Sequence, residues 1–558
     1  MREQDTTDGG NVRPRWNRMT SITLVSDFEE AERLGISQRQ FAQATGVPRT
    51  SLQFWLERKA SLDANPVLVA FFESPIGLTF LHRLVGALHF VFTQVGLSGV
   101  DQVCTFLELT GLDAFVAASH GAQHAVSTAM TAGIVTFGQT QRTRLAATMP
   151  ARTIPLAEDE TFPEGLWLVA MEPVSGFIVM EAAAENREAA TWTAAVEAAT
   201  RDMPVKIAVA GGDEAAGLAA HAAQIGAHHA PDLFHVQHPL WQALVRPLIR
   251  SLEQPAAALV KAAADTAAWR EHQARHEHGP RRVGRPPDFA RHMADAQAIE
   301  DQARQAYDTA VAHKEGAYAA IRQIGAAYHP VDPTTGALRD ADTVAKDLNA
   351  AMATLDTAAK AIDLSERRCA LIDKARRVIP KMVATIAFFY AEIGRQLTQL
   401  ALPQAAEEYV KTVLIPAAYL ARLAGRAATV VDRNALLAVR QALLDRDEPA
   451  CLAAIPLDLR CRLDRAVITC ADLFVRSSSC VEGRNGRLAL WHHHLHCISD
   501  NRLAALTVIH NYWIRRVDGT TAASRFFESP HDDLFDCLLD HMDLPARPAS
   551  TRARPLAA

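Results

Sequence analysis

Cysteine is scarce in this sequence, and long apolar runs are missing. The 558 residues include eight cysteines, none of them in a C-x-x-C pair, so a disulfide framework is excluded and a reducing compartment is expected. The apolar stretch 66–100 is interrupted by Glu73 and Arg83, which leaves no run of about 18 uncharged residues for a membrane span. Residues 1–18 lack the apolar segment of a secretory signal. We therefore expect a cytoplasmic protein with no membrane partner.

An excess of positive charge is also missing. Lysine and arginine together number 57 against 63 acidic residues, which gives a net charge of −6. That balance excludes a uniformly basic nucleic-acid coat, so any contact with DNA has to come from local clusters. At roughly 100 to 200 residues per domain, the chain is too long for one compact core.

The first recognisable unit is a pair of short helices joined by a tight turn. Ser37 is a good N-cap for a helix that runs to Ala44, and Gly46 suits the turn. Pro48 suits the first position of a second helix that ends near Lys59. The apolar positions expected to form the shared core are Leu34, Ile36, Phe41, Val47, Leu52 and Trp55. The pattern predicts a helix-turn-helix.

Several polar residues of this unit lie outside its predicted core. Between residues 36 and 60, four basic side chains stand against one acid, a net charge of +3. The second helix of such a unit enters the major groove and reads base edges with its outward side chains. The predicted DNA contacts are Arg39, Arg49, Thr50, Gln53, Arg58 and Lys59. A helical hairpin that does not bind DNA is the alternative.

Beyond residue 150 the periodicity changes from helical to β-like. The predicted strands are 154–162, 166–171, 176–180, 205–210 and 232–236, and the predicted helices after the third strand are 186–200, 214–225 and 240–252. The order β-β-β-α-β-α-β-α is that of a ribonuclease H-like mixed sheet with helices on its faces.

Most of the remaining chain shows apolar positions at helical spacing. This holds for residues 66–147 and for an alanine-rich region that extends to about residue 447, with a loop at 328–336. The expected fold is mainly α with an α/β core. A ribonuclease H-like five-stranded sheet is interrupted by a long helical insertion and preceded by a helix-turn-helix and a helical block. The insertion is most simply a structural spacer, and clamping DNA or a second protomer is the alternative.

A basic, proline-punctuated stretch lies inside this insertion, at 270–291. It contains six arginines against three acids, and residues 284–286 read Gly-Arg-Pro, which resembles an AT-hook. The arginines of such a motif lie along a narrow A·T minor groove. The stretch therefore predicts DNA contacts from Arg281, Arg282 and Arg285, and a solvated linker is an equally good interpretation.

Two aspartates occupy equivalent places in the predicted sheet. Asp159 lies at the end of the first strand and Asp213 directly after the fourth, and these strands are neighbours in a sheet of this order. Two carboxylates held close together repel each other unless a proton or a cation lies between them, and Mg²⁺ prefers oxygen ligands. A pair of such ions can activate a water or a 3′ hydroxyl for in-line attack on a phosphodiester.

The motifs around these acids resemble those of the DDE transposases of bacterial insertion sequences. The most specific motif, Asp232-Leu-Phe-His-Val-Gln-His238, follows the second aspartate. Near the carboxyl end, the run Ser477-Ser-Ser-Cys-Val-Glu-Gly-Arg-Asn-Gly-Arg-Leu488 resembles the glutamate helix of that family. The resemblance covers roughly residues 37–59, 150–250 and 475–528.

The resemblance implies that Asp159, Asp213 and Glu482 are the catalytic, metal-binding acids, with Mg²⁺ or its substitute Mn²⁺ as cofactor. Glu482 follows Asp213 by 269 residues, so the insertion has to lie between the fifth strand and the final helix. Arg484 and Arg487 would lie beside DNA, and His235 would lie near the metal without binding it.

Each metal ligand has an alternative interpretation, and Glu482 could simply be an exposed helix residue. Alternation along a strand places Glu158 and Glu160 on the opposite face from Asp159. Asp213 could simply cap the helix that follows it, and Glu214 is its nearest competitor.

The expected organisation is a disordered lead-in at 1–20, the helix-turn-helix at 21–62, a helical block at 63–148, the first part of the catalytic core at 149–254, the insertion at 255–470, the final part of the core at 471–530 and a tail at 531–558. The resemblance implies a Mg²⁺-dependent polynucleotidyl transferase, a nucleoid-associated transposase that cleaves and joins DNA at the ends of an insertion sequence. Its partners would be double-stranded DNA, as terminal inverted repeats and target, and a second protomer or more. The alternatives are a DNA-binding regulator, an inactive transposase remnant, and a non-transposing nuclease on the same fold.

Overall fold

The computed structural model describes residues 16–162, 165–280, 284–495 and 498–547. It divides into two units, Met1–Thr148 with Leu490–Ala558, and Met149–Ala489. The division falls inside α20 (Ser479–Leu495), so the segment 471–530, predicted to be the final part of the catalytic core, is shared between the two units. Most of the lead-in predicted at 1–20 lies outside the described residues.

The first unit begins with three helices, α1 (Arg18–Arg33), α2 (Gln38–Thr45) and α3 (Arg49–Ala60). The caps are as predicted, because Ser37 forms a capping box with Gln40 and Gly46 ends α2 in the left-handed region at φ 72°. The sequence reasoning missed α1, which supplies Val25 and Phe28 to the core around Phe41, Val47 and Leu52. Leu34 and Ile36 were expected in that core, but they are 78% and 38% exposed.

Residues 66–146 form the predicted helical block. Its elements are α4 (Pro66–Phe72), α5 (Pro75–Leu88), the π-helix η1 (His89–Val95), α6 (Val100–Leu109), the short 3-10 helix η2 (Leu112–Ala114) and α7 (His120–Ala146). By length and composition Pro75–Val95 could cross a membrane, and 44% of that window is buried in the protein. Leu81 and Val85 of this segment pack against Val103 and Leu107, as in a core helix.

The carboxyl-terminal helices belong to the same unit. They are α21 (Asp500–Tyr512), α22 (Ala522–Phe527) and α23 (Leu534–His541). Gly138 of α7 allows close approach of α21, since a Cβ there would lie 2.3 Å from a methyl carbon of Val508. The tail predicted from residue 531 is therefore structured as far as it is described. It ends in an ion pair of 2.7 Å between Arg547 and Glu73.

The second unit contains a small mixed sheet of five strands. They are β1 (Arg152–Thr161), β2 (Leu166–Glu172), β3 (Phe177–Ala184), β4 (Val205–Gly212) and β5 (His228–Pro231). The strand order is β3-β2-β1-β4-β5. β1 pairs with β2, and β2 with β3, in antiparallel fashion, whereas β1 with β4 and β4 with β5 are parallel.

The fifth strand is not where the sequence predicted it. β5 ends at Pro231, and the segment 232–236 instead opens α10 (Leu233–Arg250). Asp232 is the N-cap of this helix, because its side chain accepts a hydrogen bond of 2.8 Å from the backbone N–H of Phe234.

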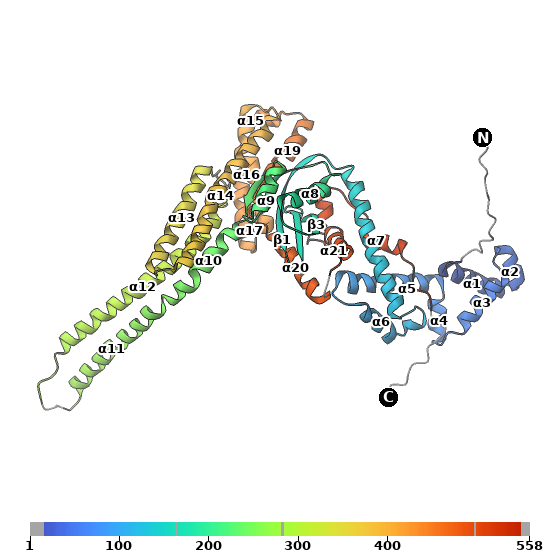
Figure 1. Ribbon diagram of the computed structural model, residues 1–558, viewed down its shortest axis with the longest axis horizontal. Helices are drawn as coiled ribbons and strands as arrows, with labels where there is room; N and C mark the ends of the chain where they lie inside the picture. Colours follow the sequence, from blue (N-terminus) through green and yellow to red (C-terminus); the bar gives the residue numbers. More distant parts are fainter. Residues whose placement is uncertain (1–15, 163–164, 281–283, 496–497, 548–558) are drawn as a thin grey trace. The chain divides into compact units, whose positions relative to one another are not determined.

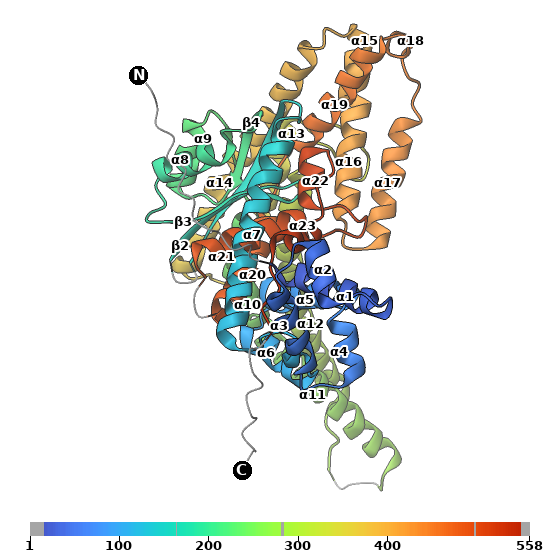
Figure 2. The ribbon, with the colours of Figure 1, turned by 90° about the vertical axis from the view of Figure 1, so that its right-hand side faces the viewer.

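Helices α8 (Ala189–Thr200) and α9 (Ala216–Gln224) cover one face of the sheet and lie together beside the strands (Figure 2). Gly212 faces Leu218 of α9, whereas the adjacent Gly211 faces Val475. Because neighbouring residues of a strand point to opposite faces, the segment around Val475, which leads into α20, covers the other face. The two parts of this α/β core are thus brought together across the insertion.

The insertion is helical, as predicted. After α11 (Glu253–His278) and α12 (Phe289–Ala327) come α13 (Ala341–Ala361), α14 (Glu366–Thr398), α15 (Gln404–Tyr409), the π-helix η3 (Val410–Leu414), α16 (Ile415–Arg426), α17 (Val430–Leu444), α18 (Ala450–Ala453) and α19 (Leu457–Asp472). α11 and α12 run side by side as a long hairpin (Figure 1). The basic stretch predicted as a linker begins inside α11 and ends inside α12, so only part of it, including the described residues 279, 280 and 284–288, lies outside the helices.

The insertion shares its hydrophobic core with α10. Leu240 and Leu244 of α10 are fully buried in one cluster with Ile324, Met382 and Phe389 of the insertion. The ring of His228 in β5 stacks on Phe388 of α14 with the ring centroids 4.5 Å apart. These contacts fix the insertion to the sheet, which a mere spacer would not require.

Candidate metal centre

The carboxyl ends of three parallel strands bring three aspartates to one edge of the sheet. Ala157 of β1 pairs with Gly211 of β4, so Asp159 and Asp213 each lie two residues beyond a paired position. Gly212 of β4 pairs with Pro231, the last residue of β5. The residue after Pro231 is Asp232, and its N–H donates a hydrogen bond of 2.9 Å to the carbonyl of Gly212. The sequence predicted the meeting of Asp159 with Asp213 but missed Asp232.

Helix α20 brings Glu482 to the same edge. Its Asn485 donates a hydrogen bond of 2.8 Å from Nδ2 to Oδ2 of Asp159, which holds the first turns of α20 against the end of β1. The pKa of Asp159 is raised to about 6, chiefly by burial, and the charges of Asp213 and Glu482 contribute to this rise. The three predicted acids therefore interact electrostatically across 269 residues of sequence.

The most closely spaced ligand set within the described residues is not the predicted triad. It consists of Asp232, His235 and Glu482, which can each offer a ligand atom within 4.8 Å of the others. Asp232 and His235 are three residues apart at the start of α10 and so lie on one side of the helix. This group could hold a metal ion, and it makes His235 a candidate ligand instead of a neighbour.

Asp232 also joins the two sequence motifs structurally. It is 2% exposed, and its Oδ2 accepts hydrogen bonds from the backbone N–H of Ser478, at 3.2 Å, and from the Ser478 hydroxyl. Ser478 directly precedes α20. The bond therefore ties the start of α10 to the start of α20 and positions Glu482. Burial raises the pKa of Glu482, and the charge of Asp232 raises it further.

The chemistry of the ligands fits a divalent cation. Carboxylate oxygens suit Mg²⁺ and Mn²⁺, whereas an imidazole such as that of His235 suits Mn²⁺ or other transition metals better than Mg²⁺. Oδ1 of Asn485 is buried without a hydrogen-bond partner in the described structure. An orphaned oxygen next to Asp159 needs a donor, which a metal-bound water supplies.

The rival acids are engaged elsewhere. Glu158 is 1% exposed on the face covered by α9, with its Oε1 3.3 Å from Nε2 of His221. Glu160 pairs with Arg187, also at 3.3 Å. These contacts agree with the expectation that Glu158 and Glu160 lie on the opposite face of the strand from Asp159. Glu214 forms an ion pair with Lys381.

Asp213 lies ahead of α9 without capping it, because the N-cap of that helix is Ala215 and no side chain caps it. Its Oδ1 accepts a hydrogen bond of 2.9 Å from the N–H of Ala215, just before α9. One carboxylate oxygen is enough for this bond, so the other is available to a metal ion.

Arg484 was predicted to contact DNA, but it lies in a buried ion pair. Its Nε and an Nη donate to the two carboxylate oxygens of Glu181 in β3, at 2.8 and 2.6 Å. The side chains are 6% and 0% exposed. This bidentate pair fastens α20 to the far side of the sheet. Arg487, one turn further, is exposed and remains a candidate for DNA contact.

Arg484→Gln is therefore expected to destabilise the second unit. Removing one partner of a buried ion pair leaves the other charge unpaired and costs about 3–5 kcal/mol. Chemical denaturation followed by circular dichroism measures the change. Arg487→Gln, on the same helix but exposed, should change the free energy of unfolding by less than about 0.5 kcal/mol. Equal effects of the two variants would contradict this role for Arg484.

Asp159→Asn is expected to stabilise the metal-free protein at neutral pH. The pKa of Asp159 is about 6 in the folded chain, against about 3.9 unfolded. Between these values the native state keeps a proton that the unfolded chain loses, so Asp159 makes the fold less stable as pH rises through that window. The variant cannot ionise. Its gain in melting temperature should be present above pH 6 and absent below pH 4, in contrast to the exposed control Asp202→Asn, which should show no pH-dependent gain.

The predicted DNA contacts of the helix-turn-helix divide into two groups. Arg39, Arg49 and Thr50 are exposed, as is Gln53, which donates to Glu57 at 2.9 Å. Lys59 is instead paired with Glu29 of α1 at 2.6 Å, and Arg58 donates to the carbonyl of Arg547 at 2.8 Å. The last two side chains hold the first unit together.

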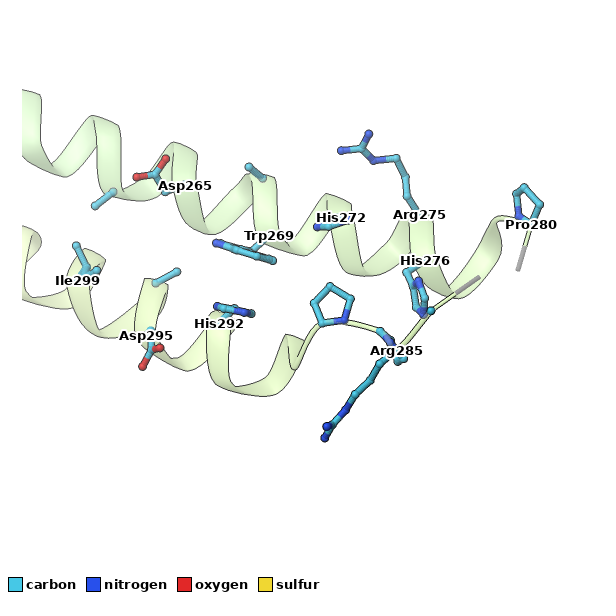
Figure 3. A pocket seen from close by; sticks show the side chains of 16 residues that line it. Asp265, Trp269, His272, Arg275, His276, Pro280, Arg285, His292, Asp295 and Ile299 are labelled. Atoms are coloured by element: carbon cyan, nitrogen blue, oxygen red, sulfur yellow. The ribbon is translucent and has the colours of Figure 1, made fainter. Parts of the chain in front are cut away.

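A cavity of about 780 Å³ lies at the tip of the α11–α12 hairpin (Figure 3). Trp269 of α11 stacks on His292 of α12 with the ring centroids 4.4 Å apart. His276 lies nearer the end of α11, and Arg285 extends from the connecting loop away from Trp269 (Figure 3). Arg281 and Arg282, also predicted to contact DNA, lie outside the described residues.

Comparison with known proteins gives one match. Residues 410–554 match the model of a family of unknown function, DUF6399. The matched segment begins at η3 and extends past α23, and it includes Glu482. No curated protein and no solved structure matches the chain.

Proposed function

We propose that this protein is a DDE transposase of the bacterial insertion-sequence type, with a ribonuclease H-like core that cleaves and joins DNA strands. One observation carries the proposal. Asp159 and Asp213 lie in register on neighbouring parallel strands, and α20, which returns after a long insertion, adds Glu482 beside them. The strand order β3-β2-β1-β4-β5, with three antiparallel strands followed by two parallel ones, supports the ribonuclease H-like assignment.

Asp159, Asp213 and Glu482 would hold Mg²⁺ or Mn²⁺, and Asp232 and His235 would complete the ligand set. Such ions activate a water for cleavage or a 3′ hydroxyl for joining, and stabilise the leaving oxygen. The remaining residues position these ligands. Asn485 holds the carboxylate of Asp159, while the bond from Ser478 to Asp232 fixes the start of the glutamate helix.

Recognition of the element ends would depend on the helix-turn-helix. Arg49 and Thr50 lie in the first turn of α3, the part of a recognition helix that contacts base edges, and Arg39 lies on α2. The tip of the α11–α12 hairpin would add a second contact through Arg285. Transposition joins two ends, so a homodimer or larger assembly on double-stranded DNA follows from this function, with a nucleoid location.

The test uses purified protein and double-stranded DNA that carries the inverted repeats flanking the gene. Mg²⁺ or Mn²⁺ should produce a strand break at the repeat end, and a pre-cut end with a free 3′ hydroxyl should be joined to target DNA. EDTA should abolish both reactions. Binding without cleavage in either metal would favour a DNA-binding regulator or an inactive remnant, whereas cleavage without joining would favour a nuclease.

A further inference from the structure

Two adjoining cavities lined by arginines lie beside the metal centre, and residues of the insertion form much of their walls. A cavity of about 390 Å³ is lined by Arg422 and Arg426 of α16 and by Arg476, which lies just before α20. An adjoining cavity of about 620 Å³ shares Arg476 and His329 with it. We call these two cavities, lined by Arg422, Arg426, Arg476 and His329, the arginine cleft.

Arg476 is half-buried in this cleft without a compensating negative charge. Its guanidinium donates to the ring of His329 and, at 3.1 Å, to the carbonyl of Gly325, while its Nε is buried without a partner. No carboxylate of the described residues lies within ion-pair distance of it. Burial lowers the pKa of Arg476. An unpaired cation that is partly buried is costly, and an anion bound in the cleft would offset that cost.

His329 does not supply the missing charge. Burial, together with the charge of Arg476, lowers the pKa of His329 to about 2, so the ring is neutral and can accept the hydrogen bond from Arg476. Its Nδ1 lies 2.6 Å from the hydroxyl of Tyr419 in α16. The ring therefore orients Arg476 from the insertion side of the cleft.

The two arginines of α16 add positive charge to the opposite wall. Arg426 donates to the carbonyl of Pro173 and has no carboxylate partner among the residues described. Arg422 donates to the carbonyl of Ala471 at 2.7 Å and lies 3.9 Å from Asp472. The acids that line the two cavities are Asp332, which is paired with Arg339 at 3.6 Å, and Asp432. The cleft as a whole is positively charged.

The cleft adjoins the metal centre directly. The carbonyl of Arg476 accepts a hydrogen bond of 2.9 Å from the N–H of Leu233, the residue after Asp232. Ser477 and Ser479 line the cleft, and Ser478 between them is bonded to Asp232. A sugar-phosphate backbone that occupies the cleft would therefore continue toward Glu482 and the aspartates of the metal centre.

We propose that the arginine cleft binds a phosphate group of the DNA strand that leads into the metal centre. The insertion is then part of the DNA-binding surface, since α16 and the loop after α12 supply its walls. That the bound phosphate belongs to DNA rests on the proposed function. That the cleft binds a phosphate rests on its arginines alone. Arginine suits this task because its fixed fork of donors matches the geometry of phosphate oxygens.

The test measures binding in EDTA, so that its result is independent of catalysis. The double variant Arg422→Gln/Arg426→Gln is compared with Arg367→Gln/Arg377→Gln, two exposed arginines of α14 that lie outside the cleft. The probe is a short fluorescein-labelled single-stranded oligonucleotide, titrated at several salt concentrations. For a single strand, each phosphate that is no longer neutralised should reduce the magnitude of the slope of log K against log salt by about 0.7, so the cleft variant, which loses one phosphate contact, should lose about 0.7. The α14 variant should keep the wild-type slope.

Two further arms keep the outcomes distinct. Inorganic phosphate should raise the melting temperature of the wild type and not of the cleft variant, which also reports whether that variant is folded. If the cleft variant does not fold, Arg426→Lys, which keeps the charge, should retain most of the affinity while Arg426→Gln does not. An unchanged slope in a folded cleft variant overturns the assignment to DNA. If phosphate still stabilises the wild type selectively, the site binds a free anion.

Discussion

Asp213→Ala is expected to abolish metal-dependent strand cleavage while leaving DNA binding intact. Asp213 lies in register with Asp159 at the edge of the sheet, and its loss removes one of the carboxylates that hold the cation. Metal ions supply several kcal/mol of stabilisation to the attacking and leaving oxygens, so the cleavage rate should fall by about 10³-fold or more. Single-turnover cleavage of labelled repeat-end DNA measures the effect.

The matched control is Asp202→Ala. Asp202 is exposed in the turn before β4, within the same unit, and has no part in the metal centre. Its removal should leave the cleavage rate within about twofold of the wild type, because surface substitutions of this kind change little. If Asp213→Ala cleaves DNA as fast as this control, Asp213 is not part of the metal centre.

His235→Ala is expected to weaken the binding of Mn²⁺. The imidazole lies with Asp232 and Glu482 in the most closely spaced ligand set of the described chain. Changes to residues that only support metal ligands already reduce affinity by about 10- to 100-fold, so the loss of a ligand should cost at least as much. Isothermal titration calorimetry of the purified protein with Mn²⁺ gives the affinity.

His238→Ala provides the comparison. His238 is one turn further along α10, is exposed, and its Nε2 lies 2.8 Å from the side-chain amide of Gln242. It should bind Mn²⁺ as tightly as the wild type. The same affinity in both histidine variants would show that His235 lies near the metal without binding it, as the sequence alone suggested.

The α/β core was largely predictable because its signals are local. β-like composition marked the first four strands, and the turn from β4 into a helix marked Asp213. The fifth strand was misplaced because β5 spans only His228–Pro231, with two histidines and a proline. The Asp-Leu sequence that followed was read as extended, although an aspartate before an apolar run is also a helix N-cap.

Long-range packing was not predictable. Apolar spacing shows that a helix has a buried face but does not say which segment covers it. Nothing in the sequence linked Gly138 to Val508, so the return of the carboxyl-terminal helices to the first unit was missed. The predicted helix-turn-helix lacked α1 for the same reason. Val25 and Phe28 of α1 complete a hydrophobic core that the two predicted helices alone cannot close.

The contacts of the candidate site could likewise be predicted only in part from the sequence. Parallel neighbouring strands predicted the meeting of Asp159 and Asp213, whereas the bond between Asp232 and Ser478 joins residues 246 positions apart. Arg484 was expected beside DNA because the position of Glu181 relative to α20 could not be known. Both pairs lie within the regions that the family resemblance covers, but which residues of these regions contact each other required the structure.

Anomalous diffraction from crystals grown with Mn²⁺ would show whether Asp159, Asp213 and Glu482 bound a metal centre. We expect anomalous density at the edge of the sheet, with oxygen atoms of these three carboxylates within about 2.0–2.6 Å of Mn²⁺. Asp232 and His235 should complete the coordination. Density elsewhere, or a site in which another acid replaces Glu482, would contradict this expectation.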